Sequence, residues 1–141
     1  MDFAGISYLA VLLAAAASFL CGGLWYGALS KPWMAASGQT AESIRAANAR
    51  RAVPWPFLIA IAAQLVMAYV LAGMIGHLGA GNVTLRNGII SGAFAWLGFV
   101  ATTVATNYAF QDRPRALTLI DAGHWLLVLL IQGAVIGLIG V

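Results

Sequence analysis

Apolar residues form four long runs along the chain, and shorter polar or glycine-containing breaks separate them. Each run is longer than the ~20 residues with which an α-helix crosses ~30 Å of hydrocarbon. The pattern predicts four transmembrane helices, at about residues 6–29, 55–78, 87–110 and 116–140. We therefore expect an all-α membrane protein, a four-transmembrane-helix bundle in which residues 1–141 form a single domain.

The amino-acid composition indicates that the chain is surrounded mainly by lipid rather than by water. Hydrophobic residues make up 62% of it and charged residues only 8%, whereas soluble domains carry about 25% charged residues. The cations lie in the breaks between apolar runs and form no basic face, so we expect no nucleic-acid partner. The single cysteine, Cys21, lies inside an apolar run and cannot form an internal disulfide.

The polar loop over residues 31–53 separates the first two predicted spans. Thr40 is a suitable N-cap for a helix over about residues 41–51, with Glu42 in its first turn and Arg50 and Arg51 in its last. This charge order suits the helix dipole, and we expect a short helix on the membrane surface. The alternative is an arm that binds anionic lipid or a partner protein.

The seven cations are distributed unequally between the predicted loops. Six fall in the first and third loops, and one falls in the second: Lys31, Arg45, Arg50, Arg51, Arg113 and Arg115 against Arg86. Because cytoplasmic loops are enriched in Lys and Arg, this asymmetry predicts a multi-pass protein of the bacterial cytoplasmic membrane with both termini outside.

Two helix ends resemble each other at a separation of 82 positions. Tyr26 corresponds to Tyr108, and Lys31-Pro32 corresponds to Arg113-Pro114. The shared spacing indicates a parallel duplication of a two-helix hairpin, with Gln64 and Gln132 as looser counterparts. The alternative is that aromatic, cationic and proline residues are common at any inner helix end.

Glycine pairs at a spacing of four predict close helix packing in three of the spans. Small residues at this spacing let helix backbones approach each other in lipid. The predicted packing glycines are Gly23, Gly27, Gly88, Gly92, Gly133 and Gly137.

Polar residues inside the last span form the candidate functional site. Asp121, His124 and Gln132 lie within about an 80° sector of one helix. We expect a cluster near the cytoplasmic side of the membrane, where an intramembrane carboxylate beside an imidazole could relay protons or bind a cation or polar solute. The full candidate cluster is Asp121, His124, Asn107, Tyr26, Tyr108 and Gln132. The alternative is structural: Asp121 pairs with Arg113, Arg115 or Lys31 at neighbouring helix ends.

The sequence gives no support for a metal centre or for a known set of catalytic residues. His77 and His124 should differ in depth by more than about 20 Å, so they cannot ligate one metal within a subunit. The chain has no Ser-His-Asp set, phosphate loop or nucleotide fingerprint. We expect no catalytic residues, no metal and no cofactor. A membrane enzyme that uses Asp121 and His124 stays open as an alternative, but it lacks a recognisable nucleophile or metal site.

The Trp25-Tyr26-Gly27 and Lys31-Pro32-Trp33 signature, with Asn107-Tyr108 and Asp121-x-x-His124 further on, resembles a small bacterial family. It is an uncharacterised family of integral membrane proteins, named as a domain of unknown function and built as one domain of four helices. The resemblance covers nearly the whole chain and implies the fold, but it implies no activity, cofactor or catalytic residue.

Two classes of function fit these features. The first is an oligomeric transport or permeation module, with the polar cluster near the path of an unidentified solute. The second is a structural or accessory membrane protein that packs against itself or a larger membrane complex through its glycine faces. We expect the lipid bilayer and further copies of the same chain as partners in either case.

Overall fold

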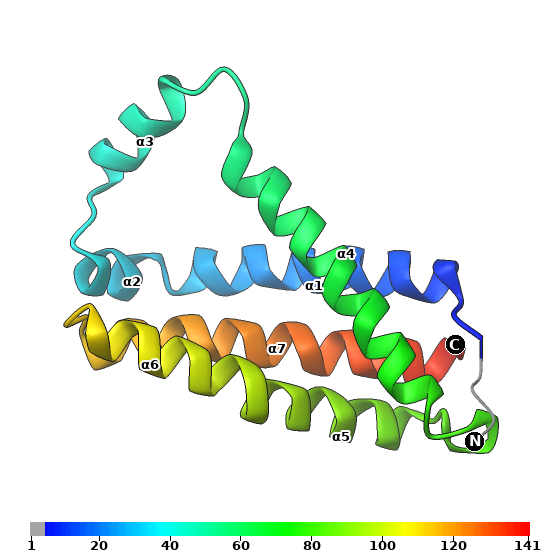
Figure 1. The fold of residues 1–141 in the computed structure, drawn as a ribbon. Coiled ribbons are helices and arrows are strands. Elements are labelled where there is room, and N and C mark those ends of the chain that lie inside the picture. Colours follow the sequence, from blue (N-terminus) through cyan, green and yellow to red (C-terminus); the bar gives the residue numbers. More distant parts are fainter. Residues whose placement is uncertain (1–4) are drawn as a thin grey trace.

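The computed structural model describes residues 5–141 and consists of helices joined by short connections (Figure 1). The N-terminal residues 1–4 of the predicted domain lie outside the described part. The helices are α1 (Tyr8–Ala28), α2 (Ser30–Ser37), α3 (Ala41–Ala49), α4 (Trp55–Gly76), η1 (Ala80–Asn82), α5 (Leu85–Ala95), η2 (Trp96–Ala101), α6 (Thr102–Phe110) and α7 (Arg115–Ile139). Segments α5, η2 and α6 form one continuous helical span.

Four helical spans are long and apolar enough to cross a membrane: α1, α4, α5–η2–α6 and α7. The predicted all-α, four-span fold is therefore confirmed, with boundaries within about two residues of those predicted. The third span begins at Leu85 rather than at Asn87, because the Thr84 hydroxyl accepts a hydrogen bond from the Asn87 backbone N–H (3.2 Å) and caps the first turn.

The polar loop contains two helices where the sequence predicted one. α3 begins after Thr40, whose hydroxyl accepts a hydrogen bond from the Ser43 backbone N–H while its own backbone N–H donates to the Ser43 hydroxyl, so the predicted N-cap is confirmed. α2 was not predicted, because Pro32 was interpreted as a helix stop. Pro32 instead lies in the first turn of α2, where a missing N–H leaves no intrahelical hydrogen bond unmade. α2 ends at Gly38, which has a left-handed backbone (φ 73°).

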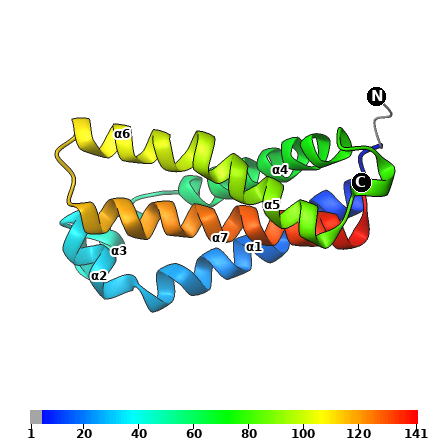
Figure 2. The same cartoon turned by 90° about the horizontal axis from the view of Figure 1, so that it is seen from below.

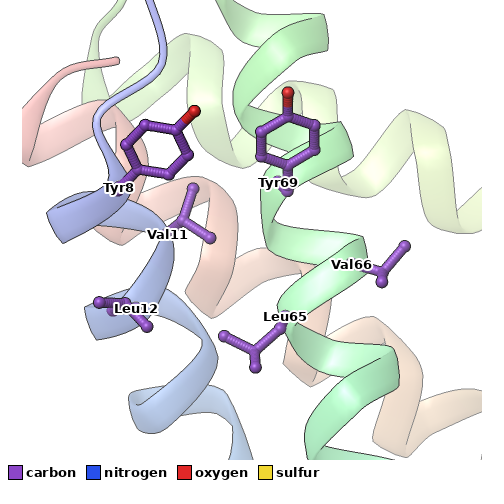
Figure 3. Close-up of a pocket in the computed structure, with 6 residues that line it drawn as sticks. All are labelled: Tyr8, Val11, Leu12, Leu65, Val66 and Tyr69. Carbon is purple, nitrogen blue, oxygen red and sulfur yellow. The ribbon is translucent and has the colours of Figure 1, made fainter.

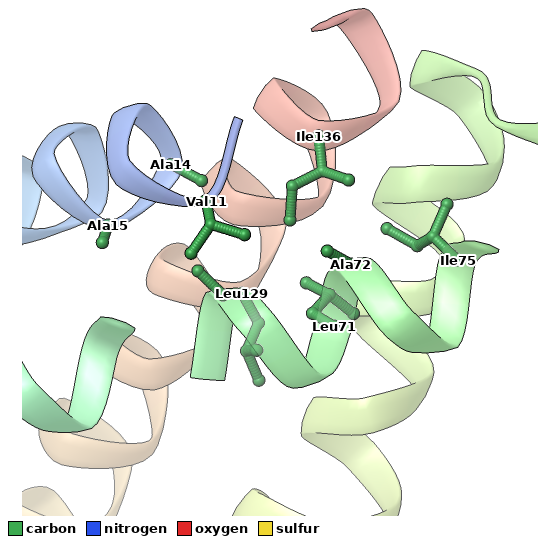
Figure 4. Packing of buried hydrophobic residues seen from close by; sticks show 9 residues of the cluster. Val11, Ala14, Ala15, Leu71, Ala72, Ile75, Leu129 and Ile136 are labelled. Atoms are coloured by element: carbon green, nitrogen blue, oxygen red, sulfur yellow. The ribbon is translucent and has the colours of Figure 1, made fainter. Parts of the chain in front are cut away.

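α7 is the central helix of the bundle. Figures 1 and 2 show it between α1 on one side and the α5–α6 span on the other, with α4 crossing the bundle at an angle. The largest core cluster lies in the half of the bundle where α1 begins and α4 and α7 end (Figure 4). Its fully buried members include Leu71, Ile75 and Ile136, and no polar side chain belongs to the cluster as described. We call this half of the bundle the apolar half.

Four of the predicted packing glycines lie where α5 meets α7. A Cβ atom added at Gly88 would overlap the backbone carbonyl of Gly133, and one added at Gly133 would overlap the carbonyl of Gly88. Gly92 and Gly137 are equally tight against the backbone of the facing helix, at Leu129 and Thr84. The two helices therefore approach closely enough for backbones to touch, which strengthens dispersion contacts in lipid.

The glycines of α1 behave differently from the prediction. A side chain added at Gly23 or Gly27 would meet open space, so neither residue packs against another helix of the chain. Their neighbour Gly22 is the packing position instead: it is buried, and a Cβ there would lie 2.6 Å from the His124 imidazole. Gly22 was missed because it lies outside the four-residue spacing on which the prediction depended.

A π-helical segment, η2, interrupts the third span at Trp96–Ala101. The wider turns of a π-helix shift the register between the helix before it and the helix after it. Composition and periodicity gave no indication of this segment, since an apolar run looks the same in either helical form.

The cations of the first and third loops lie together in space. α2, α3 and the connection between α6 and α7 are at one end of the bundle, and η1 is at the opposite end (Figure 1). Six of the seven cations therefore share one end, which we call the basic end. Large apolar side chains such as Leu24, Phe94 and Leu119 are more than two-thirds exposed along the spans, as expected for surfaces in contact with lipid.

Candidate functional site

The carboxylate of Asp121 is the meeting point of four helices near the basic end. Its Oδ1 accepts hydrogen bonds from the Tyr26 hydroxyl of α1 (2.8 Å) and from the Trp33 indole of α2 (3.2 Å). Its Oδ2 accepts a hydrogen bond from the Tyr108 hydroxyl of α6 (2.7 Å). Hydrogen bonds to an ionised acceptor are roughly twice as strong as neutral ones, so this arrangement stabilises the charge within the bundle.

All three donors to Asp121 are neutral. The structural alternative from the sequence required an ion pair with Arg113, Arg115 or Lys31, and these are not the groups that bind the carboxylate. Trp33 was missed as a partner, because the sequence analysis predicted no helix over α2. The signal that could have identified it is the first-turn position of Pro32, which permits a helix and turns Trp33 back toward α7.

Two tryptophan indoles fix α7 on either side of Asp121. Trp25 of α1 donates to the carbonyl of Ile120 (3.0 Å), and Trp96 of η2 donates to the carbonyl of Ala122 (2.8 Å). Trp25 can approach because Gly123 of α7 has no side chain: a Cβ there would lie 2.9 Å from the indole ring. The two contacts oppose rotation of α7 and keep the Asp121 carboxylate toward its donors.

His124 lies one turn deeper along α7 and faces α1. Its side chain is only 6% exposed, and its ring centre lies 4.8 Å from those of both Tyr26 and Trp125. The absence of a side chain at Gly22 makes room for the imidazole. Its Nδ1 is buried without a hydrogen-bond partner among the described residues.

Gln132 belongs to a second polar group, deeper in the bundle. Its amide nitrogen donates to the Ser18 hydroxyl and to the Gln64 backbone carbonyl, both at 3.1 Å. The Ser18 hydroxyl donates in turn to the side-chain oxygen of Gln64 (2.6 Å). All three side chains are at most 2% exposed. This group links α1, α4 and α7. Ser18 was missed because a single hydroxyl in an alanine-rich run has no distinctive pattern.

The six predicted cluster residues therefore fall into separate places. Asp121, Tyr26 and Tyr108 are joined by hydrogen bonds, and His124 contacts the ring of Tyr26. Gln132 lies in the deeper group. Asn107 is exposed, because it precedes Tyr108 by one residue and so projects about 100° away around the helix.

The two aligned tyrosines reach the same carboxylate, so they lie at the same level in the bundle. The segments after them differ: Lys31-Pro32 belongs to α2, whereas Arg113-Pro114 lies in the connection before α7. The duplication itself stays a prediction.

A cavity of about 470 Å³ lies beside His124, between α1, α4 and α7. We call it the inner cavity. It reaches Gln64 of the deeper polar group, and aromatic side chains form most of its walls. Its lining residues are Phe19, Gly22, Gly23, Tyr26, Phe57, Ala60, Gln64, His124 and Trp125.

A second groove between α1 and α4, of about 360 Å³, lies in the apolar half (Figure 3). Val11, Leu12, Leu65 and Val66 form it, and the hydroxyls of Tyr8 and Tyr69 project in the same direction at one end. No polar groups converge inside it, so it is a lipid-facing groove rather than a candidate site.

The described part of the chain contains no cluster of metal-ligating side chains. No group of three or more His, Cys, Asp or Glu side chains is arranged to hold a metal ion between residues 5 and 141. His77 follows the end of α4, whereas His124 lies in the third turn of α7, at the opposite end of the bundle.

The chain belongs to the protein family described as "Protein of unknown function (DUF1761)", which it matches over residues 9–137. The matched region runs from the first turn of α1 to the last turn of α7 and includes every residue of the site described above. Membership of a domain-of-unknown-function family, expected from the sequence, is thereby confirmed. No curated protein and no solved structure matches the chain.

Proposed function

We propose that this protein is a membrane transport module that admits protons or a small monovalent cation from the basic end of the bundle. The observation that carries the proposal is the polar stripe of α7, in which Asp121, His124 and Gln132 all face the interior. At ~1.5 Å per residue, the stripe extends from ~9 Å to ~26 Å along α7. Of these three side chains, His124 lines the inner cavity, which also reaches Gln64, whose backbone carbonyl accepts a hydrogen bond from Gln132.

The two ends of this proposed path differ in chemistry. The mouth carries the Asp121 carboxylate, which attracts cations and disfavours anions. Beyond Gln132 the bundle is closed by the fully buried side chains of Leu71, Ile75 and Ile136. Polar side chains toward one end of a bundle and a closed apolar core toward the other are what we expect of a transport protein in one of its two states.

We infer that the basic end is cytoplasmic and that both termini are outside, in a bacterial cytoplasmic membrane, because six of seven cations lie at the basic end. The test uses Ala46→Cys in α3 and Ala80→Cys in η1, each in a Cys21→Ser background. An impermeant maleimide added to intact cells should label position 80 and leave position 46 unlabelled until the cells are opened.

Both test positions are exposed and carry the same substitution, so they control for each other. Labelling of position 46 from outside would reverse the orientation.

Proton flux into liposomes that contain a pH-sensitive dye tests the transport function. The wild-type protein should raise the rate of proton or K⁺ entry above that of empty liposomes. His124→Gln should lower the proton rate by about tenfold or more, because a relay loses its titrating group.

Asp112→Asn is the control for this experiment. It removes one carboxylate at the same end of the bundle, in a residue whose positive φ (51°) asparagine tolerates. Rates equal to those of empty liposomes for both ions would refute the transport proposal.

The second candidate is a structural or accessory protein that assembles with itself or with a larger complex. The specific observation in its favour is the open, glycine-containing face of α1 at Gly23 and Gly27, where an added Cβ would meet no other atom of residues 5–141 within 4 Å. If this face joins two copies, Gly27→Leu should convert an oligomer into a monomer in size-exclusion chromatography with light scattering. A wild-type monomer would exclude self-assembly.

A further inference from the structure

The inner cavity contains two polar side chains that are almost completely buried. Gln64 is 2% exposed and His124 is 6% exposed, and both line the cavity. The side-chain oxygen of Gln64 is occupied by Ser18, so the group that Gln64 has left to offer is its amide nitrogen, a donor. The His124 imidazole forms no hydrogen bond among the described residues either, and its Nε2 lies nearest to Gly22, another lining residue of the cavity. Both side chains therefore have hydrogen-bonding capacity that the chain does not use.

The walls of the cavity are aromatic. Phe19, Tyr26, Phe57 and Trp125 contribute rings, and apart from Gln64 and His124 the other lining residues are glycine and alanine. None of the nine lining side chains is an Asp, Glu, Lys or Arg, so the cavity offers no charge to pair with an ionised ligand. Its volume of about 470 Å³ falls in the range of ~300–1,000 Å³ that small-molecule sites occupy.

We propose that the inner cavity is a binding site for a neutral aromatic alcohol that dissolves in the membrane. Its rings would stack among Phe19, Phe57 and Trp125. Its hydroxyl would accept a hydrogen bond from the Gln64 amide and donate one to the His124 imidazole. A hydroxyl suits this pair of side chains because it is donor and acceptor at once, which a ketone or an ether is not.

The ligand class follows from the combination of aromatic walls with two convergent polar groups. Aromatic rings pack favourably against other rings at centroid distances of ~4.5–7 Å. An aliphatic alcohol has no ring and would leave the four rings of the cavity without stacking partners. An unsubstituted aromatic hydrocarbon would leave Gln64 and His124 unpaired. This inference goes beyond the proposed transport function and does not rest on it, since binding is measured without ion flux.

Equilibrium dialysis of 1-naphthol against protein in lipid nanodiscs tests the proposal, with empty nanodiscs as the measure of partitioning into lipid. The wild-type chain should bind 1-naphthol saturably, at about one molecule per chain. Naphthalene, which lacks the hydroxyl, should bind at least about tenfold more weakly, because it leaves the buried polar groups unpaired.

Two glycine variants make a matched pair. Gly23 lines the cavity and Gly27 does not, yet an added side chain meets open space at both. Gly23→Leu should fill the cavity and abolish saturable binding, whereas Gly27→Leu should bind as the wild type does. Gln64→Leu and His124→Phe should each weaken 1-naphthol binding by about tenfold or more while leaving naphthalene binding unchanged.

Three results would overturn the proposal: uptake that does not exceed that of empty nanodiscs, equal binding of 1-naphthol and naphthalene, or equal binding by Gly23→Leu and the wild type. The comparison of 1-naphthol with naphthalene and the comparison of Gly23→Leu with Gly27→Leu need no change to a buried polar residue. The proposal therefore stays testable if a Gln64 or His124 variant does not fold. Loss of binding with intact ion flux, or the reverse, separates this site from the transport function.

Discussion

Replacing Gly88 with alanine should lower the free energy of unfolding by about 3 kcal/mol, close to the upper end of what an extra methyl group costs in a packed interior. The added Cβ would overlap the backbone carbonyl of Gly133. A flexible side chain could move aside, but a carbonyl within α7 can move only with its helix. Reversible unfolding in mixed micelles of increasing SDS content measures the change.

The control is Gly98→Ala, in the same membrane span. A Cβ at Gly98 meets nothing within 4 Å, so this variant should be at least as stable as the wild type. If both variants unfold alike, the close contact between α5 and α7 does not hold the bundle together. Gly133→Ala should reproduce the effect of Gly88→Ala, because it approaches the same contact from the opposite side.

Replacing Asp121 with alanine should also lower the free energy of unfolding by about 3 kcal/mol, since hydrogen bonds to a charged group contribute about 1.5–3 kcal/mol each. The substitution leaves the donors Tyr26, Trp33 and Tyr108 without their acceptor. Asp121→Asn should cost less, about 1 kcal/mol, because its amide oxygen still accepts one hydrogen bond. The same SDS titration measures both variants.

Comparing these variants shows whether Asp121 stabilises the fold or takes part in ion transport. Tyr108→Phe in the wild-type and Asp121→Ala backgrounds completes a double-mutant cycle, and we expect the tyrosine substitution to be nearly neutral once the carboxylate is gone. Asp112→Asn serves again as the charge control. If Asp121→Asn lowers stability but leaves ion flux into liposomes unaltered, the carboxylate links helices through hydrogen bonds and is not part of an ion path.

The four spans were predictable because lipid imposes one strong requirement on the chain, a continuous apolar run of sufficient length. The inward orientation of Asp121 and Gln132 followed from the same physics, since a polar side chain in hydrocarbon needs a partner. The partner itself was harder to predict. Tyr26 and Tyr108 were in the predicted cluster, whereas Trp33 required knowledge of α2, an eight-residue helix whose only marker is a proline that also ends helices.

The packing glycines were likewise predictable only in part. Gly88, Gly92, Gly133 and Gly137 lie at a helix contact, whereas Gly23 and Gly27 have the same spacing and contact no helix of the chain. Spacing identifies a surface on which a helix can pack, but whether that surface is used depends on the direction each helix takes, which is a property of the whole bundle. The π-helical η2 is a further example, because a change of helical form leaves the hydrophobicity of Trp96–Ala101 unchanged.

The hydrogen bonds from Trp25 and Trp96 have a mechanical consequence. They join α1, the third span and α7 into a frame whose members cannot turn independently without breaking a bond to the α7 backbone. α4 is held to this frame by Gln64, and its first turns, from Trp55 to Ala60, donate and accept no side-chain hydrogen bond with another helix in the described part of the chain. The first turns of α4 are therefore positioned by packing alone. Because Phe57 and Ala60 belong to these turns and line the inner cavity, this wall of the cavity is the one that no side-chain hydrogen bond fixes to the frame.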